Sequence, residues 1–60
     1  MERIGKRIQY IRRILKMNQI DFAKAIGVSQ GTLSDIETDK SKPSVDTLVS
    51  VSRYSKASID

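Results

Sequence analysis

Cysteine and histidine are both absent from this 60-residue chain, and their absence excludes several kinds of chemistry. Without cysteine there is neither a disulfide framework nor a thiolate metal site. Without histidine the chain lacks the commonest general base and the commonest nitrogen ligand for metals. Asp35, Glu37 and Asp39 lie close in sequence, but residues two apart do not face each other on a helix. We therefore expect no enzymatic activity, no metal and no cofactor.

Long apolar runs are also missing. No run approaches the roughly 18–20 apolar residues that span a bilayer, and no signal peptide is visible, so we expect no membrane partner and a cytoplasmic location. The length allows one domain over residues 1–60, too thin for a large enclosed pocket, because a chain of this size buries only about 60% of its unfolded surface. The composition, 38% hydrophobic and 30% charged, is typical of a folded globular module.

The formal net charge is +4, and the basic residues are unevenly placed. Six of them lie within the first sixteen positions, against the single acidic residue Glu2: Arg3, Lys6, Arg7, Arg12, Arg13 and Lys16. This asymmetry suits a polyanionic partner, and a solvated helix face is the alternative interpretation.

The first apolar residues follow the period of an amphipathic helix. They are spaced i, i+4, i+7 and i+11, and they are Ile4, Ile8, Ile11 and Leu15. We predict a helix from about Glu2 to Lys16, with Ile14 off the stripe and partly exposed. Gly5 inside it costs ~1 kcal/mol relative to alanine, which favours fraying of the first turn.

The middle of the chain predicts two short helices, over residues 19–26 and 30–37, joined by a tight turn. Asn18 is suited to cap the first helix, and Asp21 can reach back to the Asn18 N–H as in a capping box. Gly27 can adopt the positive φ that ends a helix and turns the chain, and Ser29 can cap the second helix. The expected buried residues are Phe22, Ala23, Ile26, Leu33 and Ile36. This arrangement is the geometry of a DNA-reading helix-turn-helix.

A polar loop over residues 38–42 is closed by Pro43, the only proline. Ser44 is suited to cap a further helix that runs to about Arg53. Its apolar residues are Val45, Leu48, Val49 and Val51. Residues 58–60 resemble the opening of a fifth helix. We therefore expect an all-α bundle of four to five helices that forms the N-terminal part of a longer regulator.

Taken together, these residues resemble the DNA-binding domain of phage repressor and Cro proteins, the XRE-type helix-turn-helix family. The motifs that carry the resemblance are Ile8-x-x-Ile11-Arg12, Asn18-Gln19-x-x-Phe22-Ala23, Ile26-Gly27-Val28-Ser29, Gln30-x-Thr32-Leu33-Ser34-x-Ile36-Glu37 and Lys42-Pro43-Ser44. The resemblance covers nearly the whole chain, and its motifs are specific as a set, although each is weak by itself. The resemblance implies a compact, lambda-repressor-like helical bundle whose third helix lies in the DNA major groove.

Base contacts are expected from the first turns of the helix over residues 30–37. Gln30 has an amide that can pair with N6 and N7 of adenine, and the matching family residue commonly makes such a contact. Gly31 either lets the backbone approach a base pair or is a small filler, and Ser34 can reach a base or a phosphate. Asp35 departs from the longer polar or basic residues of the family. It either accepts from a cytosine N4 amine or pairs with a neighbouring Lys or Arg.

Phosphate contacts are expected at helix N-termini and basic loops, because N–H groups and helix dipoles there favour anions. Gln19 matches a phosphate-binding position of the family. The other candidates are Asn18, Ser29, Lys40, Ser41 and Lys42, with Arg13 and Lys16 on a less certain helix face. For each lysine, ordinary solvation is the alternative.

The resemblance also implies a structural ion pair between Arg12 and Glu37, which ties the first helix to the end of the third. Asp39 stands where the family often has glycine. Because aspartate tolerates the left-handed conformation less well than glycine, we expect this turn to differ in detail.

The leading hypothesis is a sequence-specific DNA-binding domain of a transcriptional repressor. Such a domain would bind double-stranded DNA as a homodimer, at a palindromic operator with half-sites about 34 Å apart. The alternative is a protein-interaction or antitoxin-like helical module with little DNA affinity. Ile14, Ile20 and Ile59, apolar residues at positions expected to be exposed, would then form the partner surface.

Overall fold

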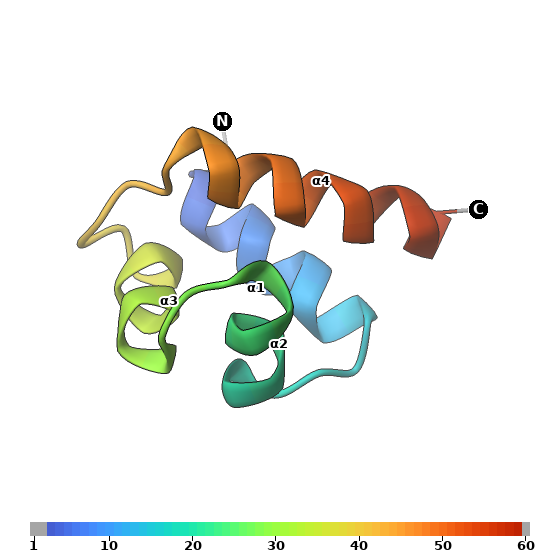
Figure 1. The fold of residues 1–60 in the computed structure, drawn as a ribbon, viewed down its shortest axis with the longest axis horizontal. Coiled ribbons are helices and arrows are strands. Elements are labelled where there is room, and N and C mark those ends of the chain that lie inside the picture. The colour runs from blue at the N-terminus through green and yellow to red at the C-terminus, as the bar shows by residue number, and fades with distance from the viewer. Residues whose placement is uncertain (1–2, 60) are drawn as a thin grey trace.

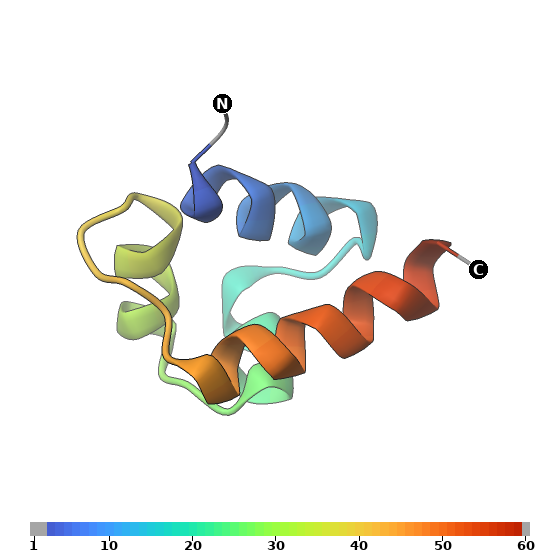
Figure 2. The same ribbon diagram turned by 90° about the horizontal axis from the view of Figure 1, so that it is seen from above.

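The computed structural model describes the backbone of residues 3–59 and the side chains of residues 3–55. This part of the chain folds into four helices without a strand: α1 (Ile4–Ile14), α2 (Gln19–Ile26), α3 (Gln30–Glu37) and α4 (Val45–Ile59). In Figure 1, α4 crosses the top of the molecule, and α2 and α3 lie beneath it. Figure 2 shows α1 and α4 running in the same general direction, with α3 at one end. The predicted all-α class is confirmed.

α1 ends two residues before its predicted end at Lys16. Lys16 adopts a left-handed backbone conformation with a φ of 59°, and its N–H donates to the Arg13 carbonyl oxygen at 3.0 Å. The chain therefore reverses here while a terminal carbonyl of the helix is satisfied. The predicted start at Glu2 lies outside the described residues.

α2 and α3 begin and end at the predicted residues, so both predictions are confirmed. Asn18 Oδ1 accepts from the Asp21 N–H at 2.8 Å, which caps α2. Ser29 Oγ accepts from the Thr32 N–H at 3.1 Å, which caps α3. Gly27 takes the expected left-handed conformation, with a φ of 81°, and turns the chain between the two helices.

α4 begins where the sequence predicted, with the Thr47 N–H donating to Ser44 Oγ at 3.2 Å. Its predicted end near Arg53 is wrong, because the helix continues to Ile59. No glycine or proline lies between residues 45 and 59, so no strong helix breaker stops it. Residues 58 and 59 form the last turn of α4 rather than the start of a fifth helix, and residue 60 lies outside the described part of the chain.

The core lies where the four helices meet. Its fully buried apolar residues are Ile8, Phe22, Ala23, Ile26, Leu33, Ile36 and Val51. The ring of Tyr54 on α4 meets the ring of Phe22 edge to face, with centroids 6.2 Å apart. Together these contacts hold α2 and α3 against α1 and α4, which gives the two short helices a rigid base.

Part of each predicted apolar stripe lies outside this core. On α1, Ile8 is buried but Ile4 is 42% exposed, and Ile14 is exposed as predicted. On α4, Val51 lies on the buried side of the helix, whereas Val45 and Val49 lie on the other side and are exposed. The four apolar residues predicted for this helix do not share one face, and packing against α1 and α2 selects which of them is covered.

Gly5 is buried where α1 meets the end of α3. A Cβ at this position would lie 2.9 Å from the Glu37 carbonyl oxygen and would clash with the Ile36 carbonyl oxygen. The Gly5 N–H donates to Asp39 Oδ1 at 3.3 Å, so a residue beyond α3 caps the start of α1. The absence of a side chain therefore permits a close helix contact, a role that the prediction of a frayed turn overlooked.

Candidate nucleic-acid interface

α3 buries one face in the core and presents the other at the edge of the molecule (Figure 1). Leu33 is 0% exposed and Ile36 is 2% exposed, so the rear of the helix is fully covered. The residues predicted to contact bases lie elsewhere on its circumference: Gln30, Gly31 and Asp35 are exposed, and Ser34 is half-buried. Apolar packing therefore fixes the inner side of α3, and its outer side is polar.

α2 and α3 begin at the same edge of the molecule, the lower edge in Figure 1. The N–H groups in the first turn of a helix have no acceptor within the helix, and they carry the positive end of its dipole. The Asn18 and Ser29 caps each satisfy one of these groups. The remaining N–H groups and two positive helix ends along one edge suit a strand of phosphates.

The Ser29 hydroxyl is engaged within the protein. It donates to Thr32 Oγ1 at 2.9 Å, in addition to accepting from the Thr32 N–H. Because Thr32 Oγ1 accepts this bond and the residue is exposed, its own proton can be donated outward. Thr32 is therefore a candidate donor that the sequence prediction missed, although its position three residues after a cap was a visible signal.

Arg12 and Glu37 meet in a bidentate ion pair between α1 and the end of α3. Arg12 Nε donates to Glu37 Oε2 at 2.7 Å, and Arg12 Nη2 donates to Glu37 Oε1 at 3.1 Å. The two side chains are only 13% and 1% exposed. Arg12 Nη1 also donates to the Met17 carbonyl oxygen at 3.0 Å, so one planar guanidinium joins α1, the connection to α2, and α3.

Gln19 joins this network from the start of α2. Its Nε2 donates to Glu37 Oε1 at 3.2 Å, and the residue is half-buried. This bond uses one of the two N–H groups of the amide and leaves the other for an external acceptor. No local spacing in the sequence pairs Gln19 with Glu37, since residues this far apart meet only through tertiary packing.

Residues 38–42 fold back over the end of α3. The Lys40 and Ser41 N–H groups donate to the Asp35 carbonyl oxygen at 2.8 and 3.2 Å. Asp39 takes the left-handed conformation, with a φ of 62°, that a glycine holds more easily, and its carboxylate accepts from the Gly5 N–H. The three predicted phosphate-binding residues of this loop are all exposed: Lys40, Ser41 and Lys42.

Two interpretations of Asp35 were open from the sequence. The ion pair between Arg12 and Glu37 is the one salt bridge among the described side chains, so Asp35 is not paired with a lysine or arginine there. Its exposed carboxylate lies on the outer side of α3, next to Ser34 in sequence and one turn after Gly31.

A glycine turn between two capped helices, with the second helix presenting a polar outer side, defines a helix-turn-helix domain. A family model described as Helix-turn-helix matches residues 8–60. The chain belongs to this family, within its phage-repressor or XRE-like type, whose members are DNA-binding regulators rather than enzymes.

The chain is similar to the immunity repressor protein of Bacillus phage phi105, with 40% identity over 48 residues. The match covers 80% of this chain and 33% of the relative, so the chain spans about a third of that protein's length. No solved structure matches the chain. Within the described residues, every helix is too short or too polar to cross a membrane.

Proposed function

We propose that this chain is the sequence-specific DNA-binding domain of a transcriptional repressor, and that it places α3 in the major groove. The observation that carries the proposal is the orientation of α3, with Leu33 and Ile36 covered and the polar side facing outward. A helix seated in this way can present its first turns to base edges without moving. The repressor role rests on the similarity to the phage immunity repressor.

Base reading is assigned to four residues of α3. Gln30, in the first turn, can donate to N7 and accept from N6 of adenine through its one amide group. The Asp35 carboxylate can accept from a cytosine N4 amine, and it would disfavour bases that present only acceptors. Ser34 can reach a base or a phosphate. Nothing lies within 4 Å of a Cβ placed on Gly31, so there is open space beside it for a base or a thymine methyl.

Phosphate binding is assigned first to the edge formed by the starts of α2 and α3. Asn18 uses its Oδ1 on the Asp21 N–H and keeps its amide N–H groups for a phosphate. Gln19 is oriented by Glu37 and offers its second N–H. Ser29 lies at the start of α3, and its hydroxyl donates to Thr32 Oγ1. The hydroxyl proton of Thr32 can then be donated to a phosphate.

A second group of phosphate contacts is assigned to Lys40, Ser41 and Lys42. Hydrogen bonds to the Asp35 carbonyl oxygen fix the backbone of this loop, so the two lysine side chains extend from an ordered segment. These contacts fix the position of α3 on the duplex but carry no sequence information of their own.

A single reading helix of this size covers only a few base pairs. We therefore propose that two copies bind a palindromic operator as a homodimer, with α3 helices about 34 Å apart, one turn of the duplex. Because its proposed partner is double-stranded DNA, we also expect the domain to act in the cytoplasm.

The test is selection of bound duplexes from a random pool, followed by fluorescence anisotropy on the selected operator. Gln30→Ala is expected to lose about 1–3 kcal/mol of discrimination at one base position, while Lys40→Ala weakens binding to all sequences alike. Ser52→Ala, an exposed change on α4, serves as the control and is expected to bind as the parent does. The proposal fails if Gln30→Ala binds the operator and its single-base variants as the parent does.

A further inference from the structure

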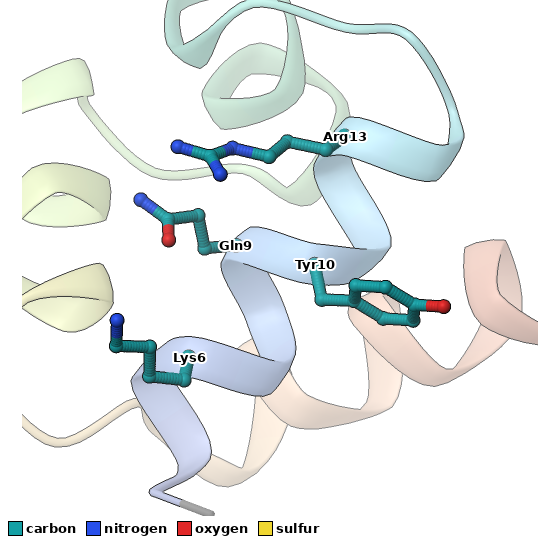
Figure 3. A pocket seen from close by; sticks show the side chains of 4 residues that line it. All are labelled: Lys6, Gln9, Tyr10 and Arg13. Atoms are coloured by element: carbon teal, nitrogen blue, oxygen red, sulfur yellow. The ribbon is translucent and has the colours of Figure 1, made fainter.

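A row of polar side chains along α1 lies outside the two groups of phosphate contacts assigned under the proposed function, although Arg13 was one of the candidates expected from the sequence. Lys6, Gln9 and Arg13 are spaced i, i+3 and i+7, so they share one side of the helix. Figure 3 shows all three extending to the same side of α1, whereas Tyr10 extends to the opposite side. The four residues line a shallow hollow of about 260 Å³.

This row, Lys6, Gln9 and Arg13, borders the contact between α1 and α3. Arg12 lies one turn after Gln9 and directly before Arg13, and it binds Glu37 at the end of α3. Gly5, directly before Lys6, is packed against the backbone of the same end of α3. The α1 row therefore runs along the solvent side of a tight helix contact, and its backbone is rigidly placed relative to α3.

The α1 row also continues the edge that begins at α2. Glu37 Oε1 accepts from both Gln19 Nε2, at 3.2 Å, and Arg12 Nη2, at 3.1 Å. One carboxylate oxygen thus links the proposed phosphate donor on α2 to Arg12 in the last turn of α1. A phosphate strand that passes Gln19 can continue along α1, first at Arg13 and then at Gln9 and Lys6.

The charge of the α1 row suits that strand. Lys6 and Arg13 are exposed, and among the described side chains neither takes part in an ion pair. α1 itself contains no acidic residue over Ile4–Ile14. Two cations flank the amide of Gln9, which is half-buried and offers two N–H donors.

We propose that the α1 row is a second phosphate-binding surface, which holds the sugar-phosphate strand that leaves the start of α2. This inference rests on the proposed function, because its occupant is the same DNA duplex. Arg13 binds phosphate oxygens through its planar guanidinium, Lys6 binds as a point charge, and the Gln9 amide donates between them. The contacts are independent of sequence and extend the length of duplex that each copy of the domain covers.

The test compares Lys6→Gln/Arg13→Gln with the parent on a random-sequence duplex over a range of salt concentrations. Loss of two phosphate contacts is expected to reduce the slope of log K against log salt by about 2 for each bound protomer. Between about 50 and about 200 mM salt, the affinity of the variant then falls about ten-fold less than that of the parent. Gln9→Ala is expected to weaken binding without this change of slope.

Lys24→Gln/Arg53→Gln is the matched control, because it removes two exposed positive charges from α2 and α4. It is expected to keep the slope of the parent, which separates local contacts from the effect of net charge. Circular dichroism checks that all variants fold. Ethylation interference on the selected operator should show phosphates that matter for the parent and not for Lys6→Gln/Arg13→Gln.

The outcomes separate the two proposals. If the parent depends on Gln30 for its operator but Lys6→Gln/Arg13→Gln keeps the slope and the interference pattern, the α1 inference is overturned and the proposed function stands. The α1 inference is also overturned if the control variant loses as much slope as the test variant. If the parent binds no duplex, both proposals fall.

Discussion

Arg12 and Glu37 are joined across the α1–α3 contact by two hydrogen bonds of 2.7 and 3.1 Å, and the Glu37 side chain is 1% exposed. The oxygen that accepts from Arg12 Nη2 also accepts from the Gln19 amide. One buried carboxylate therefore links three helices and orients a residue to which we assign a phosphate contact.

Arg12→Met is expected to lower the free energy of unfolding by roughly 3–5 kcal/mol, because Glu37 then remains buried without its charged partner. Urea unfolding followed by circular dichroism measures the change. Arg12→Met/Glu37→Leu removes both charges and is expected to recover most of the loss. A single variant as stable as the parent would show that the pair contributes little.

Gly5→Ala is expected to lower the free energy of unfolding by about 1–3 kcal/mol, because the new Cβ meets the Ile36 and Glu37 carbonyl oxygens. Gly31→Ala is the matched control on a helix with open space, and it is expected to raise stability by about 0.5–1 kcal/mol. Thermal unfolding of both variants checks the sign. Equal effects of the two changes would contradict the close contact at Gly5.

Gly31→Ala also decides between the two interpretations of this glycine. If the backbone of α3 approaches a base pair there, the added methyl group weakens binding to the selected operator while stability rises. If Gly31 is only a small filler, anisotropy titrations give the same affinity as the parent.

Lys16 and Gly27 both hold left-handed conformations, with φ values of 59° and 81°. Lys16→Gly is expected to stabilise the fold by about 0.5–1 kcal/mol. The left-handed conformation costs a non-glycine residue about 1–2 kcal/mol, and glycine avoids this cost but loses more backbone entropy on folding, which offsets part of the gain. Gly27→Ala is expected to destabilise it by about 1 kcal/mol, through strain alone, since nothing lies within 4 Å of a Cβ at this position. Chemical denaturation measures both changes, and the same sign for both would contradict the argument.

Asn18 and Ser44 cap helices at different places, so they separate stability from DNA binding. Asn18→Ala and Ser44→Ala are each expected to lower the free energy of unfolding by about 1 kcal/mol, because each loses its bond to a first-turn N–H. Only Asn18→Ala is expected also to weaken DNA binding, measured on folded protein at low temperature. A similar loss of affinity in Ser44→Ala would remove the phosphate contact assigned to Asn18.

Much of the helix-turn-helix could be predicted from the sequence because its signals are local. Asn18 and Ser29 bond to N–H groups three residues away, and Gly27 needs only its own backbone freedom. The ends of α1 and α4 were predicted less well. Lys16 adopts a left-handed conformation although it is not a glycine, so the sequence does not indicate the turn after α1. No glycine or proline indicates where α4 ends.

In the candidate site, too, local features could be predicted from the sequence and long-range contacts could not. The pattern of α3 predicted which residues face outward, because Leu33 and Ile36 identify the inner side. It did not predict that Gln19 would bond to Glu37 or that Asp39 would cap α1. These contacts join residues 18 and 34 positions apart, and no local spacing encodes them.

The amino-acid order alone determined where α2 and α3 lie and which side of each is apolar, since capping, glycine conformation and helical period act within about one turn. Tertiary structure decided how Gly5 lets α1 approach α3, how one buried carboxylate serves two donors, and which cations of α1 line the outer side of that contact. These features depend on how helices pack, and packing brings together residues whose separation along the chain carries no signal.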